Sequence, residues 1–151
     1  MPTPEEKLHE LGIELKPFTP FHPAVAPGVL TDANLLYLSG STPTSAEYRG
    51  RVGDALTVEQ GYQAARECAI NQLSQAKAVI GDLSRIKRVV KVLGMVNAAP
   101  GFPGSPAVIH GVSELYYEVF GDKGVHARSA VGLQALPSDV AVEVETIFEI
   151  E

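Results

Sequence analysis

The residues of this 151-residue chain that are best suited to chemistry lie near its C-terminus, where one arginine and two glutamates occur among very small residues. Arg128 precedes Ala130 and Gly132 in one apolar segment, and Glu143 and Glu145 lie in the next. Arginine offers a planar pair of donors that matches a carboxylate, and a nearby glutamate can transfer a proton to or from water. Together, these residue types would suit a small carboxylate ligand.

The segments that carry these residues, Arg128–Ala135 and Val140–Ile150, are predicted strands joined by residues 136–139. A four-residue loop predicts a hairpin in which Ala135 pairs with Val140, and side chains then alternate between two faces. One face would hold Arg128, Ala130, Gly132, Glu143 and Glu145, and the other would form core from Ser129, Val131, Leu133, Val142 and Val144. The alternative is that Arg128 pairs with a glutamate on a solvated face and Gly132 forms a bulge.

Other reactive side chains form no recognisable constellation. The four histidines, His9, His22, His110 and His126, lie in separate elements without metal-ligand spacing. Cys68 lies on a predicted helix beside a core position and is expected to be a buried structural thiol. Ser39 lacks the glycine pattern of a nucleophile elbow. We therefore expect no metal and no nucleophilic serine.

The elements that must position these residues follow from caps and hydrophobic spacing. Capping boxes at 3–6 and 57–60 predict a short helix over about 4–11 and a long amphipathic helix that ends at Gly81. Ser105 and Pro106 begin a further helix that ends at Gly121. Strands are predicted at 35–38 and 86–97, the latter with Val90 and Val92 on one face. Prolines make 16–28 irregular, so the chain is expected to be one domain, 1–151, with 1–28 as an N-terminal helix and extension.

This order predicts an α+β fold, a mixed sheet with two helices packed on one face and a short N-terminal helix. No apolar run approaches the ~18 residues of a membrane span, and the charged N-terminus has no signal-peptide pattern, so a cytoplasmic location is expected. Twelve Lys and Arg against eighteen Asp and Glu give a net charge of −6 without a basic cluster. Nucleic acid is therefore an unlikely partner.

The C-terminal motifs carry a resemblance to a known family. The segment 128–137, read as Arg-Ser-Ala-Val-Gly-Leu-Gln-Ala-Leu-Pro, and the Val-Glu-Val-Glu of 142–145 resemble the Rid (reactive intermediate deaminase) family, also called YjgF-type or endoribonuclease L-PSP. The resemblance covers roughly 35–151 and includes the Leu-Ser-Gly of 38–40. The chain resembles a divergent subgroup, because 20–27 replaces the family's N-terminal Tyr-Ser-Gln-Ala stretch.

This resemblance implies a chorismate-mutase-like fold and a homotrimer with ligand clefts between subunits. Arg128 would hold the substrate carboxylate, and Glu143 would position the water that hydrolyses an enamine or imine to a keto acid and ammonia, without a cofactor. The implied substrate-binding set also includes Ser39, Gly40, Ala130 and His110, the last at an asparagine position of the family. The alternative is a non-catalytic binder of a small carboxylate metabolite. Ribonuclease activity or translation inhibition rests only on the older family name, and the negative charge argues against it.

Overall fold

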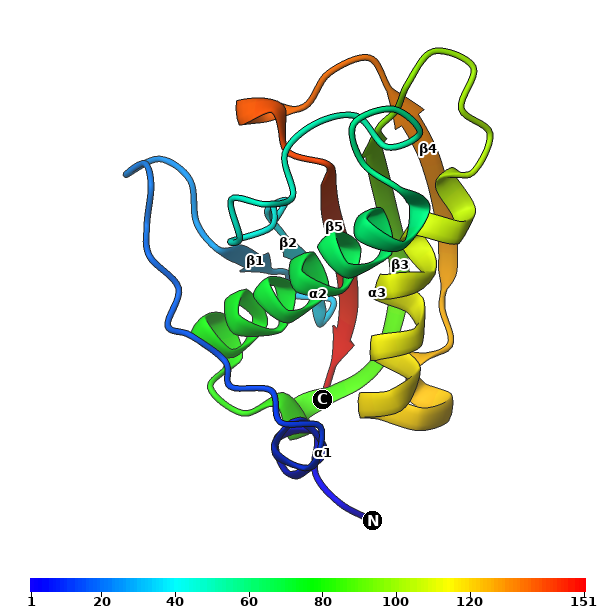
Figure 1. The fold of residues 1–151 in the computed structure, drawn as a ribbon. Coiled ribbons are helices and arrows are strands. Elements are labelled where there is room, and N and C mark those ends of the chain that lie inside the picture. Colours follow the sequence, from blue (N-terminus) through cyan, green and yellow to red (C-terminus); the bar gives the residue numbers. More distant parts are fainter.

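Arg128 and Glu143 belong to a five-stranded sheet whose strands lie in the order β1-β2-β5-β3-β4 (Figure 1). The computed structural model describes residues 1–151, and its strands are β1 (Gly28–Leu30), β2 (Leu35–Leu38), β3 (Ile86–Asn97), β4 (Ala127–Leu133) and β5 (Val142–Ile150). β3 and β4 are parallel, whereas the other neighbouring pairs are antiparallel. The predicted mixed sheet is confirmed, and β1 is a strand that the hydrophobic pattern did not predict.

Two helices cover one face of this sheet, which we call the inner face. In Figure 1, α2 (Val58–Ile80) and α3 (Ser105–Phe120) lie side by side in front of the strands. The short α1 (Pro4–Glu10) lies near the start of β3, where the Glu5 carboxylate accepts a hydrogen bond from the Leu83 amide at 2.8 Å. Short 3-10 turns occupy Leu83–Arg85, Gly121–Gly124 and Pro137–Asp139. The predicted α+β class, with two helices on one face, is confirmed.

The N-termini of α1 and α2 are fixed by the two predicted capping boxes. The Thr3 hydroxyl accepts a hydrogen bond from the Glu6 amide at 3.1 Å, and the Glu6 carboxylate accepts one from the Thr3 amide at 2.7 Å. Thr57 and Gln60 make the equivalent pair of bonds at 3.1 and 2.8 Å. Each box satisfies backbone donors that the helix itself leaves free. None of the helices combines the length and the apolar composition that crossing a membrane requires.

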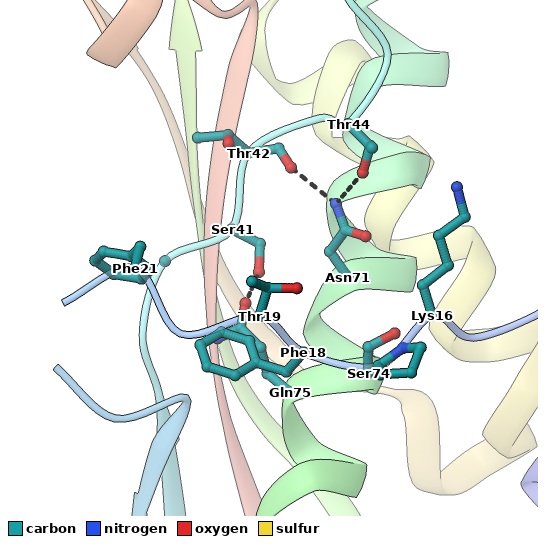
Figure 2. A pocket seen from close by; sticks show the side chains of 12 residues that line it. Lys16, Phe18, Thr19, Phe21, Ser41, Thr42, Thr44, Asn71, Ser74 and Gln75 are labelled. Carbon is teal, nitrogen blue, oxygen red and sulfur yellow. Dashed lines mark hydrogen bonds between the residues drawn. The ribbon is translucent and has the colours of Figure 1, made fainter. Parts of the chain in front are cut away.

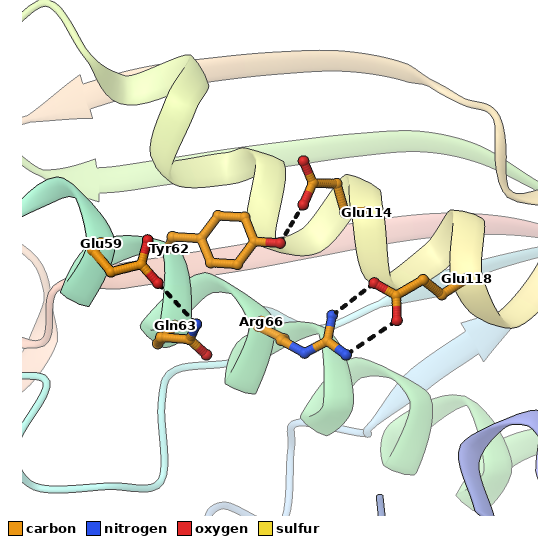
Figure 3. A network of polar contacts seen from close by, with 6 residues as sticks. All are labelled: Glu59, Tyr62, Gln63, Arg66, Glu114 and Glu118. Atoms are coloured by element: carbon orange, nitrogen blue, oxygen red, sulfur yellow. Dashed lines mark hydrogen bonds and ion pairs between the residues drawn. The ribbon is translucent and has the colours of Figure 1, made fainter. Parts of the chain in front are cut away.

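α2 and α3 cross closely because a glycine lies at their contact. A Cβ atom built on Gly111 would lie only 2.2 Å from the carbonyl oxygen of Tyr62. Nearer the surface, the Arg66 guanidinium bonds to the Glu118 carboxylate at 3.2 and 3.3 Å, and the Tyr62 hydroxyl donates to Glu114 (Figure 3). These contacts hold α3 in a fixed position over the sheet.

The Gly111 contact predicts a large cost for one added methyl group. Gly111→Ala should lower the free energy of unfolding by about 2–3 kcal/mol, because the helices must separate to relieve the overlap. Urea unfolding followed by circular dichroism measures the change. Glu114→Ala, one turn further along α3, removes only the bond from Tyr62 and should cost less than about 1 kcal/mol. Equal costs for the two variants would contradict this account of the crossing.

The core lies between the two helices and the inner face of the sheet. Leu73 of α2 and Phe148 of β5 are among its fully buried side chains. Cys68 is also fully buried, and its Sγ lies 3.6 Å from the Val142 carbonyl oxygen. Burial raises the pKa of the Cys68 thiol well above its ordinary value, which disfavours the reactive thiolate. The prediction of a buried structural thiol is therefore confirmed.

The predicted C-terminal hairpin is wrong. β3 lies between β4 and β5, so each of these strands pairs with β3 and neither pairs with the other. The chain between them crosses the end of β3, where the buried Asn97 side chain donates to the Asp139 carboxylate at 3.0 Å and to the Val140 carbonyl at 3.1 Å. The physical reason is the helix between β3 and β4, because a strand-helix-strand unit favours parallel pairing of its two strands.

The other face of the sheet carries no helix, and we call it the open face. The pairing register places on it a set of apolar side chains, namely Tyr37, Leu93, Met95, Val131 and Ile147, and among them the charged Lys91, Glu143 and Glu145. Tyr37 and Val131 are 47% and 43% exposed. An uncovered sheet face that carries several large apolar side chains is typical of a protein–protein contact.

Candidate functional site

Arg128 and Glu143 lie on opposite faces of the sheet, which corrects the predicted register. Arg128 is level with Val92 of β3, whose side chain is fully buried on the inner face, whereas Glu143 is level with Met95 on the open face. Val92 and Met95 are three residues apart on one strand. Because side chains alternate along a strand, their partners must point to opposite sides.

The same register corrects the rest of the predicted faces. Ala130 and Gly132 share the inner face with Arg128, and Glu145 shares the open face with Glu143. Of the residues predicted as core, Val142 and Val144 are fully buried, but Ser129, Val131 and Leu133 alternate onto the side away from the helices. Within one chain the guanidinium and the carboxylates are therefore separated by the sheet.

Arg128 lines a cavity of about 330 Å³ between the edge strand β4 and α3. Its Nη1 donates to His110 Nδ1 at 3.0 Å and to the Ser113 hydroxyl at 3.2 Å. Arg128 forms no ion pair, and its Nε–H and Nη2–H groups have no acceptor within the chain. The cavity thus offers a full positive charge with free donors, which is the recognition chemistry of a carboxylate.

A second histidine lies next to Ser113 in this cavity. His126 Nε2 is 3.0 Å from the Ser113 hydroxyl oxygen, and His126 Nδ1 is 2.7 Å from the Gly124 carbonyl oxygen. Burial, and to a lesser degree the Arg128 charge, lower the pKa of His126 below its ordinary 6.5. Neither Ser113 nor His126 was predicted as a site residue. The spacing of these residues in the sequence could have indicated both of them. Ser113 follows His110 by about one helical turn, and His126 precedes Arg128 by two residues, which places both side chains on one side of an extended chain.

Glu143 occupies a different environment, on the open face beside Gly40. A Cβ atom built on Gly40 would lie 3.0 Å from Glu143 Oε2, so the absence of a side chain at residue 40 leaves room for this carboxylate. Partial burial, followed by repulsion from Glu145, raises the pKa of Glu143 above its ordinary 4.5. A carboxylate with a raised pKa is a better proton acceptor, and this suits it to a proton transfer with water.

The predicted site residues thus fall into two groups. The first group combines Arg128 with His110 and has Ala130 two residues further along the same strand face. The second group combines Glu143 with Gly40 and the adjoining Ser39. Each group is assembled within the chain, but the chain does not bring the two groups together.

Ser39 and His22 also make hydrogen bonds within the N-terminal part of the chain. The Ser39 hydroxyl donates to the Ala26 carbonyl at 2.7 Å, so it holds the N-terminal extension. The exposed His22 accepts a hydrogen bond from the Ala24 amide at 3.1 Å through its Nδ1. His22 therefore stabilises a turn of the extension and belongs to neither group.

The N-terminal extension also borders a polar cavity of about 360 Å³, and Gly40 is part of the wall of that cavity. Figure 2 shows Phe18 of the extension beside Gln75 of α2. The Gln75 side-chain amide donates to the Pro27 carbonyl at 2.9 Å and to the Ser39 carbonyl at 3.0 Å. The end of the N-terminal extension is therefore held against α2, next to the segment that carries the second group.

Comparison with known proteins agrees with this architecture. The profile of the family described as "YjgF/chorismate mutase-like, putative endoribonuclease" matches residues 5–148. Protein TCP17 of Trypanosoma cruzi is 40% identical over 95% of this chain and 91% of its own length.

Two solved structures have the same fold over nearly the whole chain. The protein Atu1372 of Agrobacterium tumefaciens, of unknown function, is 40% identical, with a TM-score of 0.88 over 98% of this chain and 92% of its own. A Shewanella oneidensis protein described as a "putative endoribonuclease" is 30% identical, with a TM-score of 0.92 over 99% of this chain and 100% of its own. With its mixed sheet, its two helices on one face and the matched sequence, the chain belongs to the YjgF/Rid family, also known as L-PSP, with the chorismate-mutase-like fold.

Proposed function

We propose that the protein hydrolyses reactive enamine or imine intermediates to keto acids and ammonia, in a cleft between copies of the chain. The observation that carries this proposal is the division of the site residues into two groups. A guanidinium with free donors lies on one side of the sheet, and a carboxylate with a raised pKa lies on the other. Both groups can act on one substrate only when two chains supply them.

The two groups would have distinct tasks in the reaction. Arg128 binds the carboxylate of a 2-imino acid through its free N–H groups and thereby orients the C=N bond. Glu143 accepts a proton from water while the water oxygen bonds to the imine carbon, and it passes that proton to the nitrogen. The new hydroxyl group then gives its proton to the amine nitrogen, the C–N bond breaks, and a keto acid and ammonia leave. An enamine first takes up a proton at carbon and gives up a proton from nitrogen, and it thereby becomes the imine.

The same proposal includes the association of several copies of the chain through the open face. Apolar side chains of four neighbouring strands line this face without cover, and Glu143 lies among them. Burying such a surface against a second chain is favourable by about 25 cal/mol per Å² of apolar area. A homotrimer, as expected from the family resemblance, would cover the open face and would place a neighbouring chain next to Glu143.

The oligomeric state tests this part of the proposal. Light scattering after size exclusion should give a mass near three times the 16.1 kDa of one chain. Met95→Glu places a further carboxylate beside Glu143 on the open face and should dissociate the assembly. Val58→Glu, at an exposed position in the first turn of α2, should leave the mass unchanged. A monomeric wild-type protein would exclude a cleft between chains.

A non-catalytic binder of a small carboxylate metabolite is the second candidate function. It is favoured by one observation, namely that the Arg128 cavity with its free donors is complete within a single chain. The two functions differ in turnover. Purified protein is added to a threonine dehydratase reaction, and release of 2-oxobutanoate and ammonia is followed against buffer. Faster release supports hydrolysis, whereas saturable binding of 2-oxobutanoate by calorimetry without faster release supports the binder.

A further inference from the structure

The hydrogen bonds around Arg128 fix the position of the proton on His110. A guanidinium has only donors, so the contact between Arg128 Nη1 and His110 Nδ1 requires an unprotonated Nδ1. His110 therefore carries its proton on Nε2. Because His110 lines the same cavity as Arg128, this Nε2–H is a second donor beside the guanidinium.

The contacts of His126 fix the opposite tautomer. A carbonyl oxygen can only accept, so the 2.7 Å contact with Gly124 requires a proton on His126 Nδ1. In the neutral ring, Nε2 is then an acceptor, and the Ser113 hydroxyl donates to it. The Ser113 oxygen in turn accepts from Arg128 Nη1. All the bonds therefore run in one direction, from Arg128 through Ser113 and His126 to Gly124.

The surroundings of His126 favour this neutral, fixed ring. Neither His126 nor His110 forms an ion pair with a carboxylate. The charge that acts on His126 is that of Arg128, which opposes a second positive charge, and the charged Asp122 and Lys123 of the adjoining turn are exposed. On its other side the ring packs edge-on against the buried Tyr116, with ring centres 6.0 Å apart. The ring is thus held both by packing and by hydrogen bonds.

We infer that Ser113 and His126 are positioning residues for Arg128, and that they turn its Nε–H and Nη2–H groups, together with His110 Nε2–H, toward one ligand carboxylate. The inference rests on the proposed role of Arg128 in binding that carboxylate. Both N–H groups of Nη1 are used by His110 and Ser113, so the guanidinium plane cannot rotate without breaking a bond. A guanidinium fixed in advance loses less rotational freedom when the ligand binds.

Nuclear magnetic resonance tests the arrangement without any substrate. Nitrogen spectra of the imidazoles should show His110 protonated on Nε2 and His126 protonated on Nδ1. Slow rotation should give Arg128 separate Nη1 and Nη2 signals, and these should merge in Ser113→Ala because one restraint is lost. The control Ser84→Ala, at an exposed turn, should keep them separate. The inference would be overturned if both histidines carried the proton on the same ring nitrogen. It would also be overturned if the Nη1 and Nη2 signals of Arg128 stayed separate in Ser113→Ala.

Ligand measurements test the consequence for binding. Ser113→Ala should weaken the binding of 2-oxobutanoate and raise the KM for the imine about tenfold. The kcat of imine hydrolysis should change less than about twofold, because the carboxylate contact is made equally in the ground and transition states. Ser113→Thr keeps the hydroxyl and should restore the wild-type KM. A KM that Ser113→Ala leaves unchanged overturns the inference. If wild-type protein neither binds 2-oxobutanoate nor accelerates imine hydrolysis, the proposed function fails, and the resonance measurements still decide the hydrogen-bond chain.

Discussion

Arg128→Ala is expected to lower kcat/KM for imine hydrolysis by about a hundredfold to a thousandfold. The variant removes the two charge-assisted hydrogen bonds proposed for the substrate carboxylate, which together contribute about 3–4 kcal/mol. It also leaves His110 without its bond to Nη1, so the remaining donor loses its fixed orientation. The measurement is the rate of keto-acid release at several substrate concentrations.

Two further variants separate the roles of charge and geometry at this position. Arg128→Lys keeps the positive charge but cannot bond to a carboxylate through two parallel N–H groups, so it should recover only part of the activity. Arg88→Ala removes an exposed arginine that pairs with Glu149 and should retain full activity. Activity that survives in Arg128→Ala would show that the hydrolysis does not depend on this cavity.

Glu143→Gln is expected to lower kcat by about a hundredfold or more, since a general base contributes about 10²–10⁴-fold. The amide has the shape of the carboxylate, so the ligand should still bind with nearly the wild-type affinity. Glu145→Gln, two residues along the same face, is the matched control and should keep most of the activity. Loss of binding together with kcat would show that Glu143 contacts the ligand rather than the water.

The same substitution has an expected effect on stability that depends on pH. The pKa of Glu143 is raised in the folded chain, so the protonated carboxyl is the form that the fold favours. Its contribution to stability is complete below the ordinary value of 4.5 and is lost as the pH rises through the raised pKa. Glu143→Gln should therefore raise Tm at neutral pH and have little effect at pH 4. A lower Tm at neutral pH would contradict this account of its environment.

Local signals were sufficient to predict the helices and most of the strands. The boxes at Thr3 and Thr57 act through neighbouring residues, and both form as predicted. Along α2, Ala65, Ala69 and Leu73 recur at four-residue intervals and are buried, so the hydrophobic spacing of the sequence indicates the side that faces the core. These features depend on residues within a few turns of one another, and short-range physics determines them.

The side chains of β3 do not follow the predicted period of two along the whole strand. A strict period of two placed Val90 with Val92, yet the fully buried neighbours are Val89 and Val92. The register between β3 and β5 shifts between Val89 and Lys91, and this bulge adds one residue to β3. A bulge is a property of two paired strands, so a single segment of sequence does not show it.

The order of the strands determines whether the two groups of site residues lie on the same face of the sheet. The sequence predicts Arg128 and Glu143 on one face because β4 and β5 are consecutive along the chain, and consecutive strands are often neighbours. The structure inserts β3 between them, which moves Glu143 to the open face. The residue types predict a carboxylate-binding arginine with a glutamate beside it, but the topology determines which side of the sheet each one occupies.

The reactivity of the single thiol, Cys68, can report how often the folded chain opens. Cys68 is fully enclosed between α2 and β5, and the chain has no second cysteine that could react in its place. A thiol-specific reagent can label the chain only when these two elements part. The labelling rate in native buffer thus follows the population of opened molecules without any added dye, and comparing it with and without a keto acid gives the stabilisation that the ligand provides.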